Sequence, residues 1–543
     1  MSTRAACAFA AAIIFISALP QTPARAKGVD TDPPPGIVPT TATLAQVLAS
    51  HDKAVGKSKT PDAATIEGGA ISEYGLTGTY SQITSGDDYA MTTTLGPFVT
   101  REGMRDRQPW SENENGEVVR VQGIHTSAAA DDRALRAAMT SEVSGVMLLG
   151  EVSSPVSAYV VEVDPPGGRR EWLFFDKATG QIDRTETLLA TSRVVQTYSD
   201  FKARNGVTEA WSGHWSDGQP ENDEDWHVTS LRAASGIDAA ALDMPASRAL
   251  VQFPTGVSSV DLPVSFVDGR VILRIMVGGK GYDLLLDSGT SDISIDRGAA
   301  TAMGLKFYGQ AQFASDGKFA VSKSIVPEID VGTLKMSNVA VSVIPYSEFA
   351  KSGTEIVGLI GYDFIEGMVL RLDYDDRTAT ASVIGSYVPP PTSYVVPAAL
   401  DDRVPIVAVQ IGNAFGEHFV IDTGADLGYI FPGFAAAHPQ DIADRGEGFM
   451  MTVNAPAMYA QGVAGVTQLK PTEVAVFRLG GVSFEQWVVY RMIADAKVGA
   501  EDDEYDGLIG YDFLKFFNVV FDYADGLVYL EPNHTFAGRV THR

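Results

Sequence analysis

The chain has 543 residues, of which 45% are hydrophobic and 20% are charged, and this ordinary globular composition excludes a chain that is disordered throughout. Its 68 acidic and 41 basic residues give a formal net charge of −27, so we expect neither nucleic acid nor an anionic membrane surface as a partner. At about 100 to 200 residues per domain, the length predicts about three domains.

The first 26 residues have the pattern of a secretory signal peptide. Arg4 supplies a short positive region, an apolar run follows from Ala8 to Leu19, and Ala24-Arg25-Ala26 places small residues at the position of cleavage. The run is too short to span a bilayer, and no later stretch is long and apolar enough to do so. The alternative, a buried N-terminal helix, does not explain the cleavage pattern. We therefore predict an exported protein, periplasmic or secreted, without a transmembrane segment.

Cys7 is the only cysteine and lies within this predicted signal peptide. The mature chain is therefore expected to contain no thiol, no disulfide and no cysteine-ligated metal. The eight histidines are scattered without ligand spacing, and the sequence contains no His-Glu-x-x-His motif, no phosphate-binding glycine-rich loop and no Gly-x-Ser-x-Gly elbow. We expect no metal and no cofactor.

Residues 27–42 are predicted to form an extended linker, because Pro33-Pro34-Pro35 stands among few large apolar side chains. A short amphipathic helix should follow, with Gly56 as its C-cap. Its apolar face is formed by Leu44, Val47, Leu48 and His51. We expect His51 to be a packed core residue rather than a ligand.

Residues 43–240 are predicted to form a mostly β accessory domain. Turns such as Asn115-Gly116 and Thr179-Gly180 separate apolar segments, which indicates one curved antiparallel sheet. The clearest predicted strands are Tyr89–Leu95, Val118–Gln122, Tyr159–Val163 and Trp172–Asp176. This rhythm, with Gly116-Glu117-Val118 after an acidic turn, loosely resembles the half-barrel of periplasmic lipoprotein carriers. The resemblance implies an apolar ligand on the concave face, and the alternative is a domain without a ligand.

The acidic run Glu221-Asn222-Asp223-Glu224-Asp225 lacks the ligand order of a calcium-binding loop. We interpret it as a solvated loop. Residues 233–256 are rich in Ala, Ser and Gly, which marks a domain boundary.

The last 290 or so residues contain an internal repeat. Each copy is predicted to be a hairpin whose second strand delivers an aspartate into a tight turn. The first copy consists of a strand Val271–Val277, a turn Gly278–Gly281, a strand Tyr282–Leu286 and the motif Asp287-Ser288-Gly289-Thr290. The second copy consists of a strand Val404–Ile411, a turn Gly412–Gly416, a strand ending in Phe419-Val420-Ile421 and the motif Asp422-Thr423-Gly424-Ala425.

Each copy then closes with the same seven residues, Gly-Leu-Ile-Gly-Tyr-Asp-Phe, at 358–364 and at 507–513. A strand follows each block. The two strands end in Leu372-Asp373-Tyr374 and in Phe521-Asp522-Tyr523. We interpret the aspartates of the two blocks, Asp363 and Asp512, as caps of short helices.

These paired motifs resemble the retropepsins, the retroviral-type aspartic proteases, and the two-lobed pepsins. The resemblance covers about residues 260–532, with Ser288 in place of the threonine of the other copy. It implies a mostly β protein in which two retropepsin-like β-barrel repeats, residues 255–388 and 392–535, form a pseudo-twofold pair. The repeats would be joined near Pro389-Pro390-Pro391.

Two copies are what the chemistry requires. Peptide hydrolysis without a metal or a thiol needs one group that acts as a base and one that acts as an acid. Two carboxylates held a few Å apart share one proton, so one of them can fill each role. We therefore predict an aspartic endopeptidase in which Asp287 and Asp422 meet within one monomer, an intramolecular pseudo-dimer, and act on a polypeptide substrate.

The resemblance also implies which residues support the two loops. The hydroxyls of Ser288 and Thr423 would brace one loop against the other, and the glycines would let the backbone turn sharply. The expected supporting residues are Ser288, Gly289, Thr290, Thr423, Gly424 and Ala425.

A protease of this class also needs flaps that exclude water. In the first copy, Phe307–Phe319 contains the predicted hairpin tip Ser315-Asp316-Gly317-Lys318. In the second copy, Phe449–Gly465 contains a candidate tip at Asn454-Ala455-Pro456. Three methionines there, interpreted first as core residues, could instead line an apolar groove: Met450, Met451 and Met458.

Two alternatives stay open. In the first, the chain is a catalytically silent relative that binds peptides, with carboxylates that do not face each other. In the second, the function lies in the N-terminal domain, which would carry a lipid or a lipoprotein, and the repeats are accessory.

Overall fold

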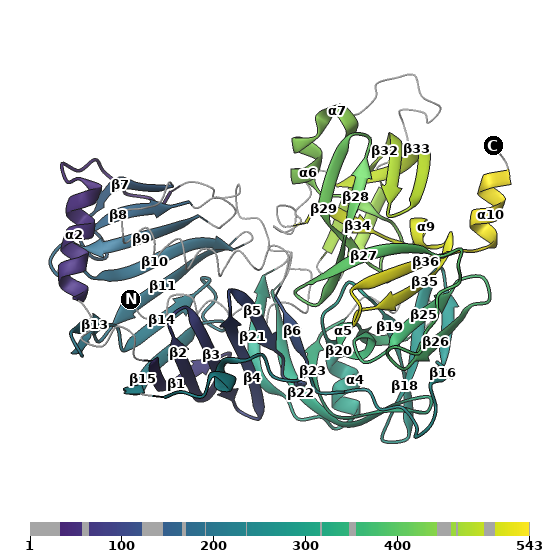
Figure 1. The fold of residues 1–543 in the computed structure, drawn as a ribbon, viewed down its shortest axis with the longest axis horizontal. Coiled ribbons are helices and arrows are strands. Elements are labelled where there is room, and N and C mark those ends of the chain that lie inside the picture. Colours follow the sequence, from purple (N-terminus) through teal and green to yellow (C-terminus); the bar gives the residue numbers. More distant parts are fainter. Residues whose placement is uncertain are drawn as a thin grey trace. The chain divides into compact units, whose positions relative to one another are not determined.

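The computed structural model describes residues 33–56, 64–121, 145–164, 170–189, 192–234, 236–314, 318–346, 355–442, 458–462, 465–492 and 505–541. These residues are mostly in β-strands (Figure 1). They divide into two compact units: the first runs to Ser247 and includes Tyr308–Gln312, and the second contains Arg248–Phe307 and the chain from Phe313 on. The predicted signal peptide, residues 1–26, lies outside the described residues.

The described part of the first unit is built on one antiparallel sheet, as predicted. Its strand order is β6-β5-β4-β3-β2-β1-β15-β14-β11-β10-β9-β8-β7. The strands are β1 (Ala64–Glu73), β2 (Leu76–Ser85), β3 (Asp88–Leu95), β4 (Phe98–Arg105), β5 (Gln108–Glu112), β6 (Val118–Arg120), β7 (Val146–Val152), β8 (Ala158–Val163), β9 (Glu171–Asp176), β10 (Ile182–Leu189), β11 (Ser192–Ser199), β14 (Ser212–Ser216) and β15 (Glu224–Ala234). A separate hairpin joins β12 (Lys202–Arg204) to β13 (Val207–Glu209).

The predicted amphipathic helix is α2 (Leu44–Val55), which lies against the β7 end of this sheet in Figure 1. A capping box at Thr43 begins it, and Gly56, with φ +77°, ends it. His51 is a core residue, as predicted: one ring nitrogen is 2.9 Å from the Gly180 carbonyl oxygen, and the ring packs edge-on against Phe175.

The prediction of a solvated acidic loop at 221–225 is wrong for Asn222, which is 8% exposed, and most clearly for Glu224. This residue begins β15, is only 1% exposed, and lies directly opposite Glu73 of β1, which is 2% exposed. Burial raises the pKa of Glu224 to about 8. Burial, and then the charge of Glu224, raise the pKa of Glu73 and that of Glu102 on β4 well above the usual range. The sheet therefore holds three carboxyls that resist ionisation.

These carboxyls predict that the protein loses stability as pH rises. Their folded-state pKa values lie above the unfolded value of 4.5, so the folded state binds more protons than the unfolded state. The contribution of these carboxyls to the unfolding free energy is therefore lost between about pH 4.5 and about pH 8. Glu224→Gln should remove much of this slope in the unfolding free energy, and the exposed Glu221→Gln should retain it. Denaturant titrations at pH 5, 6.5 and 8 measure the slope, and equal slopes in both variants would refute the assignment.

The second unit contains two halves with the same strand order. The first half runs β17-β18-β19-β24-β20-β23-β22 and the second runs β27-β28-β29-β34-β30-β33-β32. In both halves, the strand that leads to the aspartate pairs in parallel with the strand of the closing block. The first half has β17 (Val264–Val267), β18 (Arg270–Val277), β19 (Lys280–Leu286), β20 (Ile293–Asp296), β22 (Lys318–Val331), β23 (Leu334–Ile344) and β24 (Ile356–Ile360). The second has β27 (Tyr394–Asp401), β28 (Val404–Ile411), β29 (Ala414–Ile421), β30 (Tyr429–Ile430), β32 (Gly465–Leu479), β33 (Val482–Met492) and β34 (Gly507–Ile509).

Strands from both halves also share one sheet, because β25 pairs with β35 through Leu370 and Phe521. All six residues of β35 are buried in this shared sheet, including the polar Asn518 and Asp522. The shared strands are β16 (Ser259–Asp261), β25 (Val369–Asp373), β26 (Thr378–Ser382), β35 (Phe517–Asp522) and β36 (Leu527–Pro532). The helices among the described residues of this unit are α4 (Arg297–Ala302), α5 (Tyr362–Ile365), α6 (Pro432–Ala437), α7 (Pro439–Ile442), α9 (Tyr511–Leu514) and α10 (His534–Thr541).

The flap predictions are only partly within the described chain. Residues 315–317 of the first predicted tip, the second predicted tip at 454–456, Met450 and Met451 lie outside the described residues. The strands β21 (Tyr308–Ala314) and β22 flank the first tip. In the second half, β31 (Met458–Gly462) pairs with β32, and Gly462 lies opposite Gly465. No helix among the described residues has the length and apolar character needed to cross a membrane.

Candidate active site

The two motif aspartates stand at equivalent places in the two halves. The Asp287 amide donates to the Ile360 carbonyl, and the Asp422 amide donates to the Ile509 carbonyl, each at 3.0 Å. Each aspartate thus follows a buried strand, and its backbone amide is hydrogen-bonded to the closing block of its own half. The sequence Leu-Ile-Gly is repeated in both blocks because it supplies this strand and the turn after it.

The two carboxyls meet and share a hydrogen bond. Their backbone partners differ: Asp287 Oδ1 accepts one amide, from Gly289 at 2.9 Å, while Asp422 Oδ1 accepts two, from Gly424 at 2.7 Å and Ala425 at 3.1 Å. Because each amide hydrogen bond favours the ionised form of a carboxyl, the geometry places the negative charge on Asp422 and the shared proton on Asp287.

The electrostatics of the pair agree with this division. Burial raises the pKa of Asp287 well above its usual range, and the charge of Asp422 and the hydrogen bond to it raise it further. Burial also raises the pKa of Asp422, but the hydrogen bond from Asp287 and the two backbone amides oppose that rise. Both pKa values are therefore raised, as expected of two buried carboxyls that share one proton, and the rise is opposed by more hydrogen bonds at Asp422 than at Asp287.

Two hydroxyls tie the loops of the two halves together. Thr423 Oγ1 accepts the Ser288 amide at 3.0 Å and donates to the Leu286 carbonyl at 2.9 Å. In return, Ser288 Oγ accepts the Thr423 amide at 3.1 Å and donates to the Ile421 carbonyl at 2.7 Å. Both side chains are buried. The serine in the first motif thus makes the same set of bonds as the threonine in the second.

This network predicts a stability loss for Thr423→Val. Valine keeps the shape of threonine but leaves the Ser288 amide and the Leu286 carbonyl without their partner in a buried place, which costs about 1 to 3 kcal/mol of unfolding free energy. Thr423→Ser retains the hydroxyl and should recover most of the loss. Denaturant unfolding measures both variants, and equal stabilities for valine and serine would contradict the bracing role.

The remaining predicted supporting residues are held by backbone contacts. The Thr290 carbonyl accepts the Tyr362 amide at 3.0 Å, and the Ala425 carbonyl accepts the Tyr511 amide at 2.9 Å. Gly289 and Gly424 leave room for the carboxyls: a Cβ on Gly424 would lie 2.5 Å from Asp287 Cγ, and a Cβ on Gly289 would lie 2.8 Å from Asp422 Cγ. Glycine is required at both places by this close approach.

The structure adds contacts between the halves that sequence reasoning missed. Arg270 forms a two-pronged ion pair with Asp426, with distances of 3.0 and 2.7 Å. Tyr362 stacks on Tyr523, and Tyr374 packs against Tyr511, so each closing block touches the other half. Only the repeated tyrosines gave a signal in the sequence, since they occur at matching places in the two copies.

The closing-block aspartates are not N-caps, contrary to our interpretation. Gly361 and Gly510 are the N-caps of α5 and α9, and neither makes a side-chain capping bond. Asp512 instead lies in the first turn of α9, where its Oδ1 accepts the Gly428 amide at 2.7 Å and the Phe513 amide at 3.1 Å. It therefore fastens the end of the loop that begins at Asp422.

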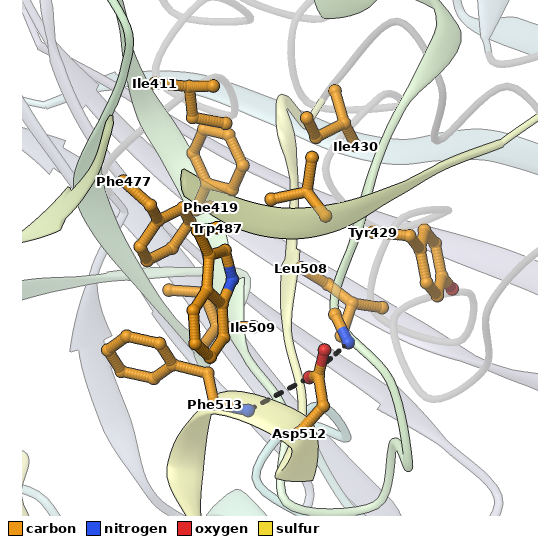
Figure 2. A pocket seen from close by; sticks show the side chains of 12 residues that line it. Ile411, Phe419, Tyr429, Ile430, Phe477, Trp487, Leu508, Ile509, Asp512 and Phe513 are labelled. Atoms are coloured by element: carbon orange, nitrogen blue, oxygen red, sulfur yellow. Dashed lines mark hydrogen bonds between the residues drawn. The ribbon is translucent and has the colours of Figure 1, made fainter. Parts of the chain in front are cut away.

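A small cavity lies beside Asp512 in the second half (Figure 2). About 20 Å³ of it is open to the centre of a water molecule, which is roughly the room that one water needs. Most of its lining side chains are apolar, and Asp512 is the one carboxyl among them. The lining side chains include Ile411, Phe419, Tyr429, Phe477, Trp487 and Phe513. Within the described ranges, no group of three or more His, Cys, Asp or Glu side chains is arranged to hold a metal.

One comparison with known proteins finds a protease family model that matches part of the chain. The family model described as "Aspartyl protease" matches residues 273–364. An aspartic proteinase from Irpex lacteus is 14% identical, with a TM-score of 0.33, over 52% of this chain and 99% of its own. A LolA superfamily protein from Nitrosomonas europaea is 13% identical, with a TM-score of 0.28, over 37% of this chain and 98% of its own. Likenesses at these scores carry no inference about function. No curated protein matches the chain.

Proposed function

We propose that the chain is an aspartic endopeptidase, exported to the periplasm or secreted, in which Asp287 and Asp422 hydrolyse peptide bonds. The observation that carries the proposal is the hydrogen-bonded pair of carboxyls, delivered by equivalent strands and held by reciprocal hydroxyl bonds. The aspartyl protease match to residues 273–364 supports it independently. The two halves with one strand order are taken as two copies of one retropepsin-like repeat.

The proton placement suggests the role of each carboxyl. Asp422, ionised, takes a proton from water as the water oxygen bonds to the peptide carbonyl carbon. Asp287 at the same time gives its proton to the carbonyl oxygen, which yields a tetrahedral diol. Asp422 then protonates the amide nitrogen, the C–N bond breaks, and Asp287 recovers a proton from a diol hydroxyl. The pair ends in its starting state, so the cycle balances.

The test is hydrolysis of an unfolded protein by the full chain, followed across pH. Because the pair must hold one proton, the rate should fall at low pH, where Asp422 becomes protonated, and at high pH, where Asp287 loses its proton. The raised pKa of Asp287 moves the alkaline limb upward. A statine-type inhibitor should block the reaction, and a chelator should leave it unchanged. Loss of the activity on chelation would overturn the proposed mechanism.

The same assay separates the alternatives. A silent peptide-binding relative would bind the unfolded protein and release no new N-termini. A carrier function of the N-terminal domain is a separate hypothesis, and apolar material that co-purifies with the full chain would favour it. The acidic surface and the chemistry give nucleic acid no role in the proposed reaction.

A further inference from the structure

The loop after Asp422 is held along its length by the closing block of its half. The block accepts the Asp422 amide at Ile509, and two of its own amides, those of Tyr511 and Asp512, donate to loop carbonyls at Ala425 and Asp426. All of these bonds join backbone groups. The last bond is different, because the Gly428 amide donates to the carboxyl of Asp512 at 2.7 Å. The strength of this one attachment therefore depends on a charge.

Gly428 has little freedom to find another partner. A Cβ on it would lie 2.9 Å from the Leu508 carbonyl oxygen and 3.2 Å from the Gly510 nitrogen, so its backbone is packed against the closing block. Its neighbour Tyr429 begins β30 and pairs with Leu508. The carboxyl of Asp512 thus sits at the point where the Asp422 loop becomes a strand.

The surroundings of Asp512 disfavour its ionised form, so the carboxyl takes up a proton more readily than an exposed one. Its carboxyl borders the small apolar cavity, next to Trp487 and Phe513 (Figure 2). Lys515, one turn further along, is the cation that attracts it, and the phenol of Tyr490 on β33 is the other titratable group that senses it. Burial outweighs the Gly428 and Phe513 amides and Lys515, and it raises the pKa of Asp512 to about 6.

The equivalent residue of the first half gives a matched control. Asp363 occupies the same place in the identical block Gly-Leu-Ile-Gly-Tyr-Asp-Phe and is 1% exposed. The strand pairing places Ile293 where the second half has Gly428, since both precede the residue that faces the block leucine. The first half therefore supplies a side chain at the position where the second half has Gly428 and the cavity.

We propose that Asp512 is a positioning residue which, in its ionised form, holds the Asp422 loop by the Gly428 amide and, when protonated, loosens it. The effect on catalysis rests on the proposed function, whereas the effect on the loop does not. A neutral carboxyl still accepts an amide but binds it less strongly, because charge-assisted hydrogen bonds are roughly twice as strong as neutral ones.

The loop can be followed in the full chain without any substrate. We expect the protection of the Gly428 amide against hydrogen exchange, corrected for the intrinsic effect of pH, to fall about fivefold to tenfold between pH 7 and pH 5. In Asp512→Asn the protection should stay at its low-pH level throughout. Asp363→Asn should keep the wild-type pH dependence.

A second measurement, the fluorescence of Trp487, keeps the proposal testable if one variant folds poorly. Trp487 lines the same cavity and is the one tryptophan of the chain beyond residue 226. The fluorescence of wild type minus that of Trp487→Phe isolates the signal of Trp487, and this signal should change with a midpoint near pH 6. When both proteins also carry Asp512→Asn, the change should be absent.

Two results would overturn the proposal: constant Gly428 protection across pH 6 in the wild type, or a pH-dependent drop that persists in Asp512→Asn. If the chain cleaves peptides, kcat should carry the same inflection, absent in Asp512→Asn. If it cleaves none, the proposed function fails, while the exchange and fluorescence results still decide whether Asp512 controls the loop.

Discussion

Asp287→Asn and Asp422→Asn should each lower the rate of peptide hydrolysis by at least about 10³-fold. Asparagine keeps the size of aspartate but can neither take a proton from water nor hold the shared proton, so either variant leaves half of an acid–base pair. The rate of appearance of new N-termini in an unfolded protein measures the loss.

The matched control is Asp268→Asn, since Asp268 is exposed on the turn between β17 and β18. It should retain the wild-type rate. If either catalytic variant kept more than about a tenth of the activity, that carboxyl would not belong to the reacting pair.

Gly424→Ala should lower the rate by about 10²-fold or more, although it removes no reacting group. The added methyl would lie 2.5 Å from Asp287 Cγ, so the carboxyl of the other half must move away from its partner. Gly289→Ala should act in the same way on Asp422, where the distance is 2.8 Å. Steady-state kinetics should show the loss in kcat, with the far-ultraviolet circular dichroism unchanged.

The glycine variants test geometry rather than chemistry. A wild-type rate in Gly424→Ala would mean that the two carboxyls need not stay in contact, which contradicts a shared proton. A lower rate that is accompanied by unfolding would be uninformative about the pair, so the denaturant midpoint of each variant is measured alongside and only variants within about 1 kcal/mol of wild type are compared.

Several strands of the second unit can be predicted from the sequence because each is a run of mostly apolar residues next to a turn. Val404–Ile411 is apolar except for Gln410 and is followed by a glycine turn, and it is β28 with the same bounds. The helix at Leu44–Val55 was likewise marked by an apolar face and a terminal glycine. Matching motifs in two copies also located Asp287 and Asp422, which the structure brings together.

The missed features depend on contacts between residues far apart in the chain. The burial of Glu224 follows from its place opposite Glu73, about 150 residues away in sequence, and charge alone favours a solvated loop. The ion pair of Arg270 with Asp426 spans the two halves and has no local pattern. Asp512 was recognised as a repeated residue, but its partner Gly428 is set by the pairing of β30 with β34.

The most direct test of the account is the specific activity of a mixture of Asp287→Asn and Asp422→Asn chains, compared with wild type over a range of protein concentrations. Because one chain is proposed to contain one complete pair, the equal mixture should be as inactive as each variant, and the wild-type rate per chain should not change on dilution. Recovery of activity in the mixture, or a specific activity that rises with concentration, would show that the reacting carboxyls come from different chains and would contradict the account.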